Sequence, residues 1–287
     1  MYIAKQSGKN RYHLFDTKQD MAVKIQRESI QDIRSALDKN QFVLYYQPKI
    51  NMKTNEVIGV EALIRWQHPE KGLVPPLDFL PIIEGHILSI EIGEWVINTA
   101  LAQIMEWQKL GLILTISVNI GARQLQQEDF ARRLEKSFAA YPDVPKGQLE
   151  LEVLETSALG DISHVSKIMQ TCCEQGVTFA LDDFGTGYSS LTHLRRLPVN
   201  LIKIDQTFVR DMLEDKGDLA IVEGVVGLAK AFKREVIAEG GETIEHGEKL
   251  MQLGCELAQG YGIAKHMPAE EIPNWVLAWL SSEHWCL

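Results

Sequence analysis

The chain has 287 residues, of which 45% are hydrophobic and 24% charged, a balance typical of a globular protein with one large domain or two small ones. Its 39 acidic residues exceed its 29 basic residues, and the net charge of −10 argues against general nucleic-acid binding. A small anionic ligand is still compatible with this charge if metal ions invert the local field.

Several simple signals bear on the compartment. No apolar run approaches the roughly 18 residues of a membrane-spanning helix. The opening "MYIAKQSGKNRYHLFD" is polar and basic, unlike a secretory signal peptide. The cysteines, Cys172, Cys173, Cys255 and Cys286, lack the spacing of a zinc site, and adjacent cysteines rarely bridge each other. We therefore expect a cytoplasmic protein with reduced thiols and no membrane contact by this segment, and we interpret the adjacent cysteines as packing residues rather than a redox switch.

The N-terminal segment differs in composition from the rest of the chain. Residues 1–20 are basic and look like a separate piece, and we expect residues 21–27 to form a linker. A helix is predicted around Ser29–Leu37. Two apolar runs follow, "FVLYYQ" (42–47) and "VIGVEALIRW" (57–66), separated only by "PKINMKTNE". This connection is too short for a crossover helix, so the two strands should pair antiparallel.

Six more apolar runs follow, at 112–119, 149–155, 177–183, 201–205, 235–240 and 257–262. Amphipathic stretches lie between most of them, at Glu91–Leu110, Phe130–Ala140, Ser163–Gln175 and Leu219–Phe232. Strands that alternate with helices indicate βαβ units, and eight such units in about 250 residues favour a closed barrel. The sequence therefore predicts an α/β fold, a modified (β/α)₈ TIM-like barrel with one antiparallel strand.

Polar residues occur within or at the ends of seven of these apolar runs: Glu61, Asn119, Glu152, Asp182, Lys203, Glu239 and Gln259. Residues at the C-terminal ends of barrel strands converge on one pocket. Carboxylates and an amide oxygen there would suit Mg²⁺ or Mn²⁺, and two such ions can clamp the oxygens of a phosphoryl transfer. A lysine beside them would orient a water or stabilise developing negative charge.

The stretch "FALDDFGTGYSSL" (179–191) places two aspartates before a glycine-rich loop. Successive strand side chains point to opposite faces, so Asp182 and Asp183 serve one site only where the chain turns. Gly185 and Gly187 supply the freedom for that turn. Carboxylates this close repel each other unless a proton or a cation lies between them, so Asp182 could bridge two ions.

Each of these residues also has a structural interpretation. An acid at a strand end often caps a helix, a lone lysine often forms an exposed ion pair, and Asn119 before Gly121 can begin a turn. The repetition of the same chemistry across strand ends argues against these interpretations. The pattern alone predicts a metal-dependent barrel enzyme and no particular substrate.

The motif "EALIRW" (61–66) resembles the signature of the EAL-domain cyclic-di-GMP phosphodiesterases. Seven further blocks resemble motifs of that family in the same order: "YYQP" (45–48), "SVNIGARQL" (117–125), "LELEVLE", "ALDDFGTGYSSL", "LIKID", "AEGGET" (238–243) and "QGYGIA" (259–264). The resemblance covers roughly residues 28–282.

The resemblance implies hydrolysis of cyclic-di-GMP to linear pGpG with two divalent cations, Mg²⁺ or Mn²⁺. The residues that match the ligands of the first cation are Glu61, Asn119, Glu152 and Asp182, and those that match the second are Asp182 and Asp183. Lys203 matches the lysine that positions the water, with Glu239 and Gln259 completing the catalytic shell. The positions that match dinucleotide contacts are Gln47, Leu63, Arg65 and Glu242.

The resemblance also implies partners. The loop after Asp183 resembles the family's link between the active site and a homodimer interface, and Glu155 matches the acid that steadies it. Residues 1–20 resemble the end of a GGDEF (diguanylate cyclase-type) domain, which implies a longer GGDEF–EAL protein whose upstream sensory regions could tether it to a membrane. The alternative for residues 1–20 is an ordinary N-terminal arm.

Three positions depart from the family pattern. Leu154 stands where a threonine is frequent, Gly121 replaces a common serine, and Gly241 replaces a valine. None matches a metal ligand, and the extra backbone freedom of Gly241 predicts an altered rate or affinity rather than lost chemistry.

The main alternative function is a catalytically inactive cyclic-di-GMP receptor that signals through conformation or dimerisation. Such receptors lack a metal ligand or the lysine, and here every such position is filled. A scaffold controlled through the "DDFGTGYSSL" loop is compatible with activity, and an enolase-like barrel enzyme requires the motif matches to be disregarded.

Overall fold

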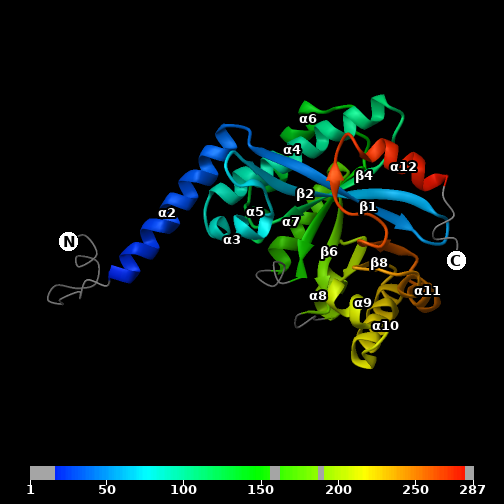
Figure 1. The fold of residues 1–287 in the computed structure, drawn as a ribbon. Helices are drawn as coiled ribbons and strands as arrows, with labels where there is room; N and C mark the ends of the chain where they lie inside the picture. Colours follow the sequence, from blue (N-terminus) through cyan, green and yellow to red (C-terminus); the bar gives the residue numbers. More distant parts are fainter. Residues whose placement is uncertain (1–16, 156–161, 187–190, 282–287) are drawn as a thin grey trace.

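The computed structural model describes residues 17–155, 162–186 and 191–281. A ring of eight strands forms its centre, in the order β1-β9-β8-β7-β6-β5-β4-β2, and β2 pairs with β1 to close it (Figure 1). The ring strands are β1 (Phe42–Asn51), β2 (Glu56–His68), β4 (Thr115–Ile120), β5 (Leu149–Leu154), β6 (Thr178–Phe184), β7 (Leu201–Ile204), β8 (Glu235–Glu239) and β9 (Leu257–Gln259). This arrangement confirms the predicted barrel.

One ring strand is reversed, as predicted. β1 pairs antiparallel with both β2 and β9, whereas the other neighbouring ring strands pair parallel. The turn between β1 and β2 is stabilised by Asn51, whose side-chain oxygen accepts the backbone N–H groups of Lys53 at 2.9 Å and Thr54 at 3.1 Å. Asparagine favours such turns because its side chain mimics a backbone acceptor.

Helices follow the ring strands and cover the barrel from outside (Figure 1). They are α3 (Leu80–Ile83), α4 (Leu88–Lys109), α5 (Ala122–Leu125), α6 (Phe130–Ala140), α7 (Ile162–Gln175), α8 (Leu191–Arg196), α9 (Gln206–Asp211), α10 (Lys216–Ala231), α11 (Ile244–Leu253) and α12 (Ile272–Leu280). Within residues 17–155, 162–186 and 191–281, no helix is both long and apolar enough to cross a membrane.

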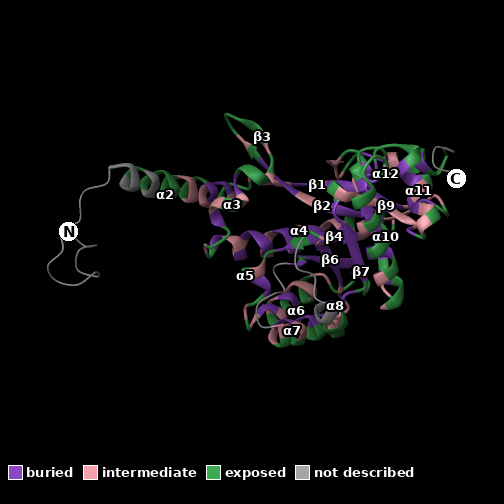
Figure 2. Cartoon of the chain, turned by 90° about the horizontal axis from the view of Figure 1, so that it is seen from below, coloured by how far each residue is buried: buried purple, intermediate pink, exposed green. Residues whose placement is uncertain are grey.

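The N-terminal helix, α2 (Thr17–Asp38), begins earlier than the sequence predicts. The expected linker at 21–27 is part of this helix, which extends away from the barrel (Figure 2). The last part of α2 packs on the barrel, where Ile33 and Ala36 are buried and Arg34 forms an ion pair with Glu91, whereas residues 24–28 are exposed. The expected GGDEF-like remnant lies mostly outside the described residues, as does Cys286.

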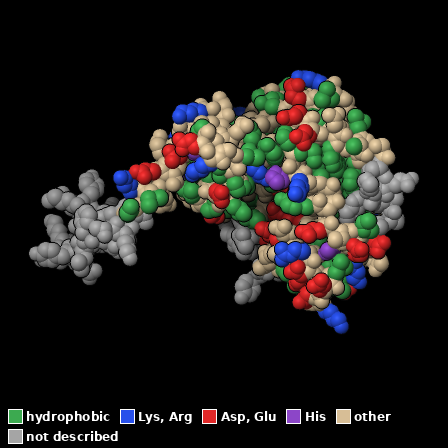
Figure 3. All heavy atoms as spheres, in the orientation of Figure 1, with side chains coloured by type: hydrophobic (Ala, Val, Ile, Leu, Met, Phe, Trp, Pro, Cys, Tyr) green, Lys and Arg blue, Asp and Glu red, His purple; other side chains and the backbone are tan. Residues whose placement is uncertain are grey.

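The elements that were not predicted include several short helices and also β3 (Gly72–Val74), the 3₁₀ helix η1 (Pro76–Asp78) and β10 (Met267–Pro268). β3 extends the sheet beyond β2, and β10 pairs with Tyr45 and Tyr46 of β1. Figure 2 shows buried residues concentrated on the ring strands and on the inward faces of the helices. Acidic side chains form several groups across the face in Figure 3, in keeping with the net charge of −10.

Candidate active site

The end of β6 brings two consecutive aspartates to the same mouth of the barrel. Asp183 has a left-handed backbone (φ 54°), and the pairing of β6 with β7 shifts register between Leu181 and Phe184. The carboxylate of Asp182 accepts the backbone N–H of Asp183 at 3.0 Å. Aspartate tolerates this conformation better than most residues. The change of direction therefore occurs at Asp183 itself, earlier than the predicted glycine turn, although Gly185 also has a positive φ of 104°.

Lys203, on β7, lies among four carboxylates from four other strands. Its Nζ is 2.5 Å from Oε2 of Glu152, 2.7 Å from Oε1 of Glu239, 3.0 Å from Oδ1 of Asp182 and 3.6 Å from Oε2 of Glu61. The Lys203 side chain is 1% exposed. Such a buried ammonium is tolerated only when its charge is compensated, as it is here.

A chain of amide side chains surrounds Glu61. The Nδ2 group of Asn119 donates to Oε1 of Glu61 at 2.7 Å, and Nε2 of Gln259 donates to Oε2 at 2.6 Å. Nε2 of Gln259 also lies 3.1 Å from Oε1 of Gln47, whose own amide donates to the carbonyl of Ala264 at 3.0 Å. Oε1 of Gln259 is buried and accepts no hydrogen bond from the residues that the structure describes.

A second lysine, which the sequence analysis did not single out, reaches the same site from β1. Lys49 Nζ donates to Oε1 of Glu152 at 2.7 Å, to Oε1 of Glu150 at 3.0 Å and to Oγ of Ser117 at 2.5 Å. The side chain of Lys49 is 3% exposed and that of Glu152 is fully buried. The sequence analysis placed Lys49 in the connection "PKINMKTNE", but β1 continues to Asn51. The alternation of Lys49 with Gln47 was the one sequence signal of an inward position.

Glu152 and Lys203 each shift the pKa of the other. Burial alone would raise the pKa of Glu152, but the ammonium groups of Lys203 and Lys49 lower this pKa to about 2. Burial alone would lower the pKa of Lys203, but the surrounding carboxylates, led by Glu152 and Glu239, raise it well above its ordinary value. Both groups are therefore charged at neutral pH.

Two other carboxylates hold protons more tightly than usual. Desolvation raises the pKa of Glu239 to about 8, against the opposing attraction of Lys203. Burial and the charges of Asp182 and Asp205 raise the pKa of Asp183 to about 6. Asp205 was also not predicted; it follows Lys203 by two positions and caps α9 by accepting the N–H of Thr207 at 2.9 Å.

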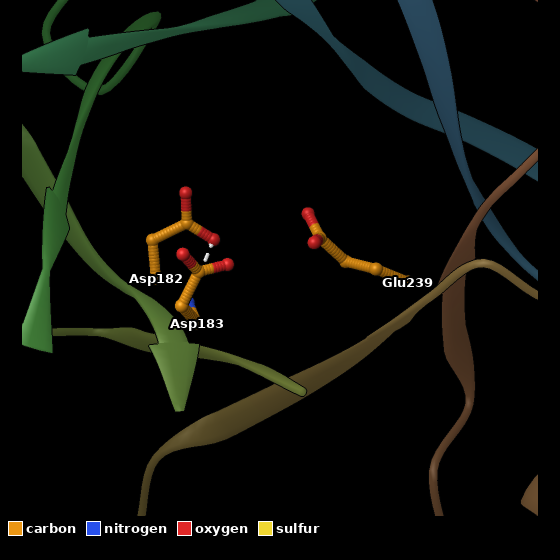
Figure 4. Close-up of side chains that lie close together, drawn as sticks. All are labelled: Asp182, Asp183 and Glu239. Atoms are coloured by element: carbon orange, nitrogen blue, oxygen red, sulfur yellow. Dashed lines mark hydrogen bonds between the residues drawn. The ribbon is translucent and has the colours of Figure 1, made fainter. Parts of the chain in front are cut away.

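The acidic residues fit a divalent cation. Ligand oxygens of Asp182, Asp183 and Glu239 all lie within 4.8 Å of one another, and Figure 4 shows the two aspartates facing Glu239 across a gap. Carboxylate oxygens are the donors that Mg²⁺ and Mn²⁺ prefer. Because Glu61 and Glu152 lie at the same mouth, the carboxylates outnumber the two buried lysines, and cations would balance this excess.

The predicted dinucleotide contacts differ in burial and in their partners. Arg65 is buried, donates to the carbonyl of Ile64 at 2.8 Å and lies 6.0 Å from the ring centre of Tyr45. Leu63, two positions earlier on β2, is half-buried and pairs with Tyr45 in register. Gln47 is held by Gln259, as described above. Glu242 is exposed, in the connection between β8 and α11.

An aromatic group that the sequence analysis did not assign lies beside Arg65. The ring of His266 is 5.9 Å from that of Tyr45 and stacks at 6.3 Å with Tyr261. Burial, with the charges of Arg65 and Lys265, lowers the pKa of His266, so the imidazole is neutral at pH 7.

Glu155 directly follows β5 and is 4% exposed. Its Oε2 has no hydrogen-bond partner among the described residues. Residues 187–190 of the loop that it is expected to steady, through which a homodimer is expected, lie outside the described residues.

Comparisons with known proteins place this site in a family context. The chain is 38% identical over 273 residues to the bifunctional diguanylate cyclase/cyclic di-GMP phosphodiesterase MucR of Pseudomonas aeruginosa, covering 95% of this chain and 40% of MucR. It is 36% identical over 285 residues to the cyclic di-GMP phosphodiesterase PdeR of Escherichia coli, covering 98% of this chain and 42% of PdeR. The chain thus spans about two fifths of the length of these curated relatives.

The fold is shared with a solved structure, the PaMucR phosphodiesterase in complex with c-di-GMP. The TM-score is 0.81 at 38% identity, over 85% of this chain and 99% of that chain. The EAL domain model matches residues 30–266, which include every strand of the ring. The chain therefore belongs to the EAL domain family.

Proposed function

We propose that this chain is a cyclic-di-GMP phosphodiesterase that hydrolyses its substrate to linear pGpG with two divalent cations. The observation that carries the proposal is the convergence of Glu61, Glu152, Asp182 and Glu239 on Lys203 at one mouth of the barrel. The names of MucR and PdeR, which the chain matches over nearly all of its length, support the same substrate.

The residues that would hold the first cation are Glu61, Asn119, Glu152 and Asp182, and those for the second are Asp182 and Asp183. Bound Mg²⁺ or Mn²⁺ supplies Lewis-acid polarisation of the phosphate and lowers the pKa of a coordinated water. The family relationship and the oxygen-rich donor set support this assignment.

The protein's own residues would orient the reaction. Because Lys203 stays protonated, it would act as a hydrogen-bond donor that positions the attacking water or stabilises negative charge on phosphate, and not as a base. Glu239 accepts from Lys203 and fixes its direction. Gln259 holds Glu61 and Gln47 in place, with one oxygen still available to a ligand.

The substrate would be held by Gln47, Leu63, Arg65 and Glu242. Arg65 suits a phosphate because its planar guanidinium can bond two oxygens at once. In a longer protein, residues 1–20 would complete a GGDEF-like domain upstream, and the loop after Asp183 would contribute to a homodimer.

Product analysis tests the proposal. The purified chain is incubated with cyclic-di-GMP and Mg²⁺ or Mn²⁺, beside a chelator-treated sample, a Lys203→Ala variant and a matched Lys136→Ala variant on the exposed face of α6. We expect pGpG from the parent chain and Lys136→Ala, and at least a ~100-fold slower reaction from Lys203→Ala and the chelated sample. Dinucleotide that binds and stays intact would instead identify a receptor.

A further inference from the structure

The buried lysine of β1, Lys49, has no part in the proposed reaction. Its Nζ makes three contacts of 2.5 to 3.0 Å, to Ser117, Glu150 and Glu152, so each ammonium proton has one acceptor. Lys49 reaches the interior because Lys49 and Gln47 lie two positions apart, on the same face of β1.

A purely structural lysine would need only one counter-ion. Glu150, which is 8% exposed, already serves as one and also accepts a hydrogen bond from Ser117 at 2.6 Å. A single counter-ion does not account for the additional contact of Lys49 with Glu152, at 2.7 Å.

Glu152 is held from two sides. Lys49 bonds its Oε1 and Lys203 bonds its Oε2, so the two ammonium groups fix the carboxylate plane and leave only the remaining lone pairs for another ligand. The two lysines come from β1 and β7, which are not neighbours in the ring. The carboxylate is therefore oriented by the closed barrel as a whole and not by its own strand.

We propose that Lys49 is a positioning residue, which orients Glu152 and thereby sets the affinity of the site for divalent cations. The proposal rests on the proposed role of Glu152 as a metal ligand. Partners that orient a ligating carboxylate typically contribute about 10- to 100-fold in metal affinity.

The direction of the change in cation affinity distinguishes a positioning role of Lys49 from a purely electrostatic one. Removing a positive charge near a cation site strengthens cation binding by Coulomb's law. Removing a group that orients a ligand weakens it. A Lys49→Met substitution therefore gives opposite results under the two explanations, whatever it does to stability.

Mn²⁺ binding, measured by isothermal titration calorimetry without dinucleotide, tests the proposal. The variants are Lys49→Met, Glu150→Gln and the double variant Lys49→Met/Glu150→Gln. The double variant removes one charge of each sign, so its net charge is that of the parent chain, and Glu150 is not left as a buried carboxylate without its cation. Circular dichroism and thermal unfolding report the folded state of each protein.

We expect both variants that lack Lys49 to bind Mn²⁺ at least ~10-fold more weakly than the parent chain. Glu150→Gln should stay within about threefold of the parent, because its amide oxygen still accepts from Lys49 and Ser117. Should Lys49→Met fail to fold, the charge-matched double variant decides the question alone.

Unchanged or tighter Mn²⁺ binding by a folded variant without Lys49 would overturn the proposal, as would a parent chain that binds no Mn²⁺. Normal Mn²⁺ binding by the parent without any pGpG formation would contradict the proposed function and leave the role of Lys49 intact.

Discussion

At the scale of single residues, the ionised forms of two carboxyl groups in the site are unfavourable. Glu239 and Asp183 have raised pKa values, of about 8 and about 6, because burial and neighbouring carboxylates disfavour their ionised forms. A carboxyl group with a raised pKa in the folded state binds more protons there than in the unfolded chain. Its contribution to stability therefore decreases as the pH rises between the two pKa values.

For Glu239 this window extends from its ordinary value of 4.5 to about 8. In a chelating buffer, we expect the thermal midpoint of the parent chain to fall between pH 5 and pH 8 relative to that of Glu239→Gln, which cannot titrate. Thermal unfolding of both proteins across this range measures the difference. Parallel curves would show that Glu239 is an ordinary carboxylate in the folded protein.

The residues that sequence reasoning found and missed differ in a physical way. Asp182, Asp183 and Glu239 were found because acidic side chains in apolar strands are unfavourable unless they are paired or bind a metal ion. Lys49 was missed because the predicted strand ended at Gln47 and Lys49 fell in the polar connection after it, whereas β1 continues to Asn51. Asp205 was missed because an acid that ends a strand is explained equally well as a helix cap, and here it is one.

At the scale of elements, consecutive glycines at the end of β8 have different requirements. Gly240 has a φ of 74°, and a Cβ there would lie 2.7 Å from Cβ of Gln206. Gly241 lies outside the left-handed region, and a Cβ there would meet nothing within 4 Å. Steric constraints on a Cβ atom therefore do not require glycine in place of the family's valine at position 241.

We expect opposite effects on stability from the two alanine substitutions. Gly241→Ala should stabilise the fold by about 0.4–1 kcal/mol, because it reduces the freedom of the unfolded chain. Gly240→Ala should destabilise it by about 1–3 kcal/mol through backbone strain and the contact with Gln206. Urea denaturation measures both changes, and a destabilised Gly241→Ala would mean that this strand end needs its flexibility.

Other elements show the limits of pattern reading. The apolar runs located all eight ring strands, because strands that are buried on both faces are nearly continuous runs of hydrophobic residues. β3 and β10, of three and two residues, are too short for a periodic signal. The extent of α2 was missed because residues 24–28 are exposed, so burial imposes no apolar stripe on that stretch of the helix.

At the scale of the whole molecule, α2 combines an exposed stretch at residues 24–28 with a last part that is anchored on the barrel. Ile33 and Ala36 are 1% and 0% exposed, whereas residues 24–28 are exposed. Deleting residues 1–28 should change the thermal midpoint by less than about 2 °C, whereas deleting residues 1–37 should lower it by several degrees through lost burial. Differential scanning calorimetry of both truncations checks this, and equal midpoints would mean that the anchor is dispensable.

The closure of the ring has a mechanical consequence. β1 meets β9 through only two residue pairs, Ile50 with Ala258 and Asn51 with Leu257, yet this junction carries Gln47 and Lys49 on one side and Gln259 on the other. α2 ends at Asp38, and β1 begins at Phe42. α2 leads into the Phe42 end of β1, whereas the pairs with β9 lie at its other end, so a displacement of the helix would reach this junction only along the length of β1, past Gln47 and Lys49.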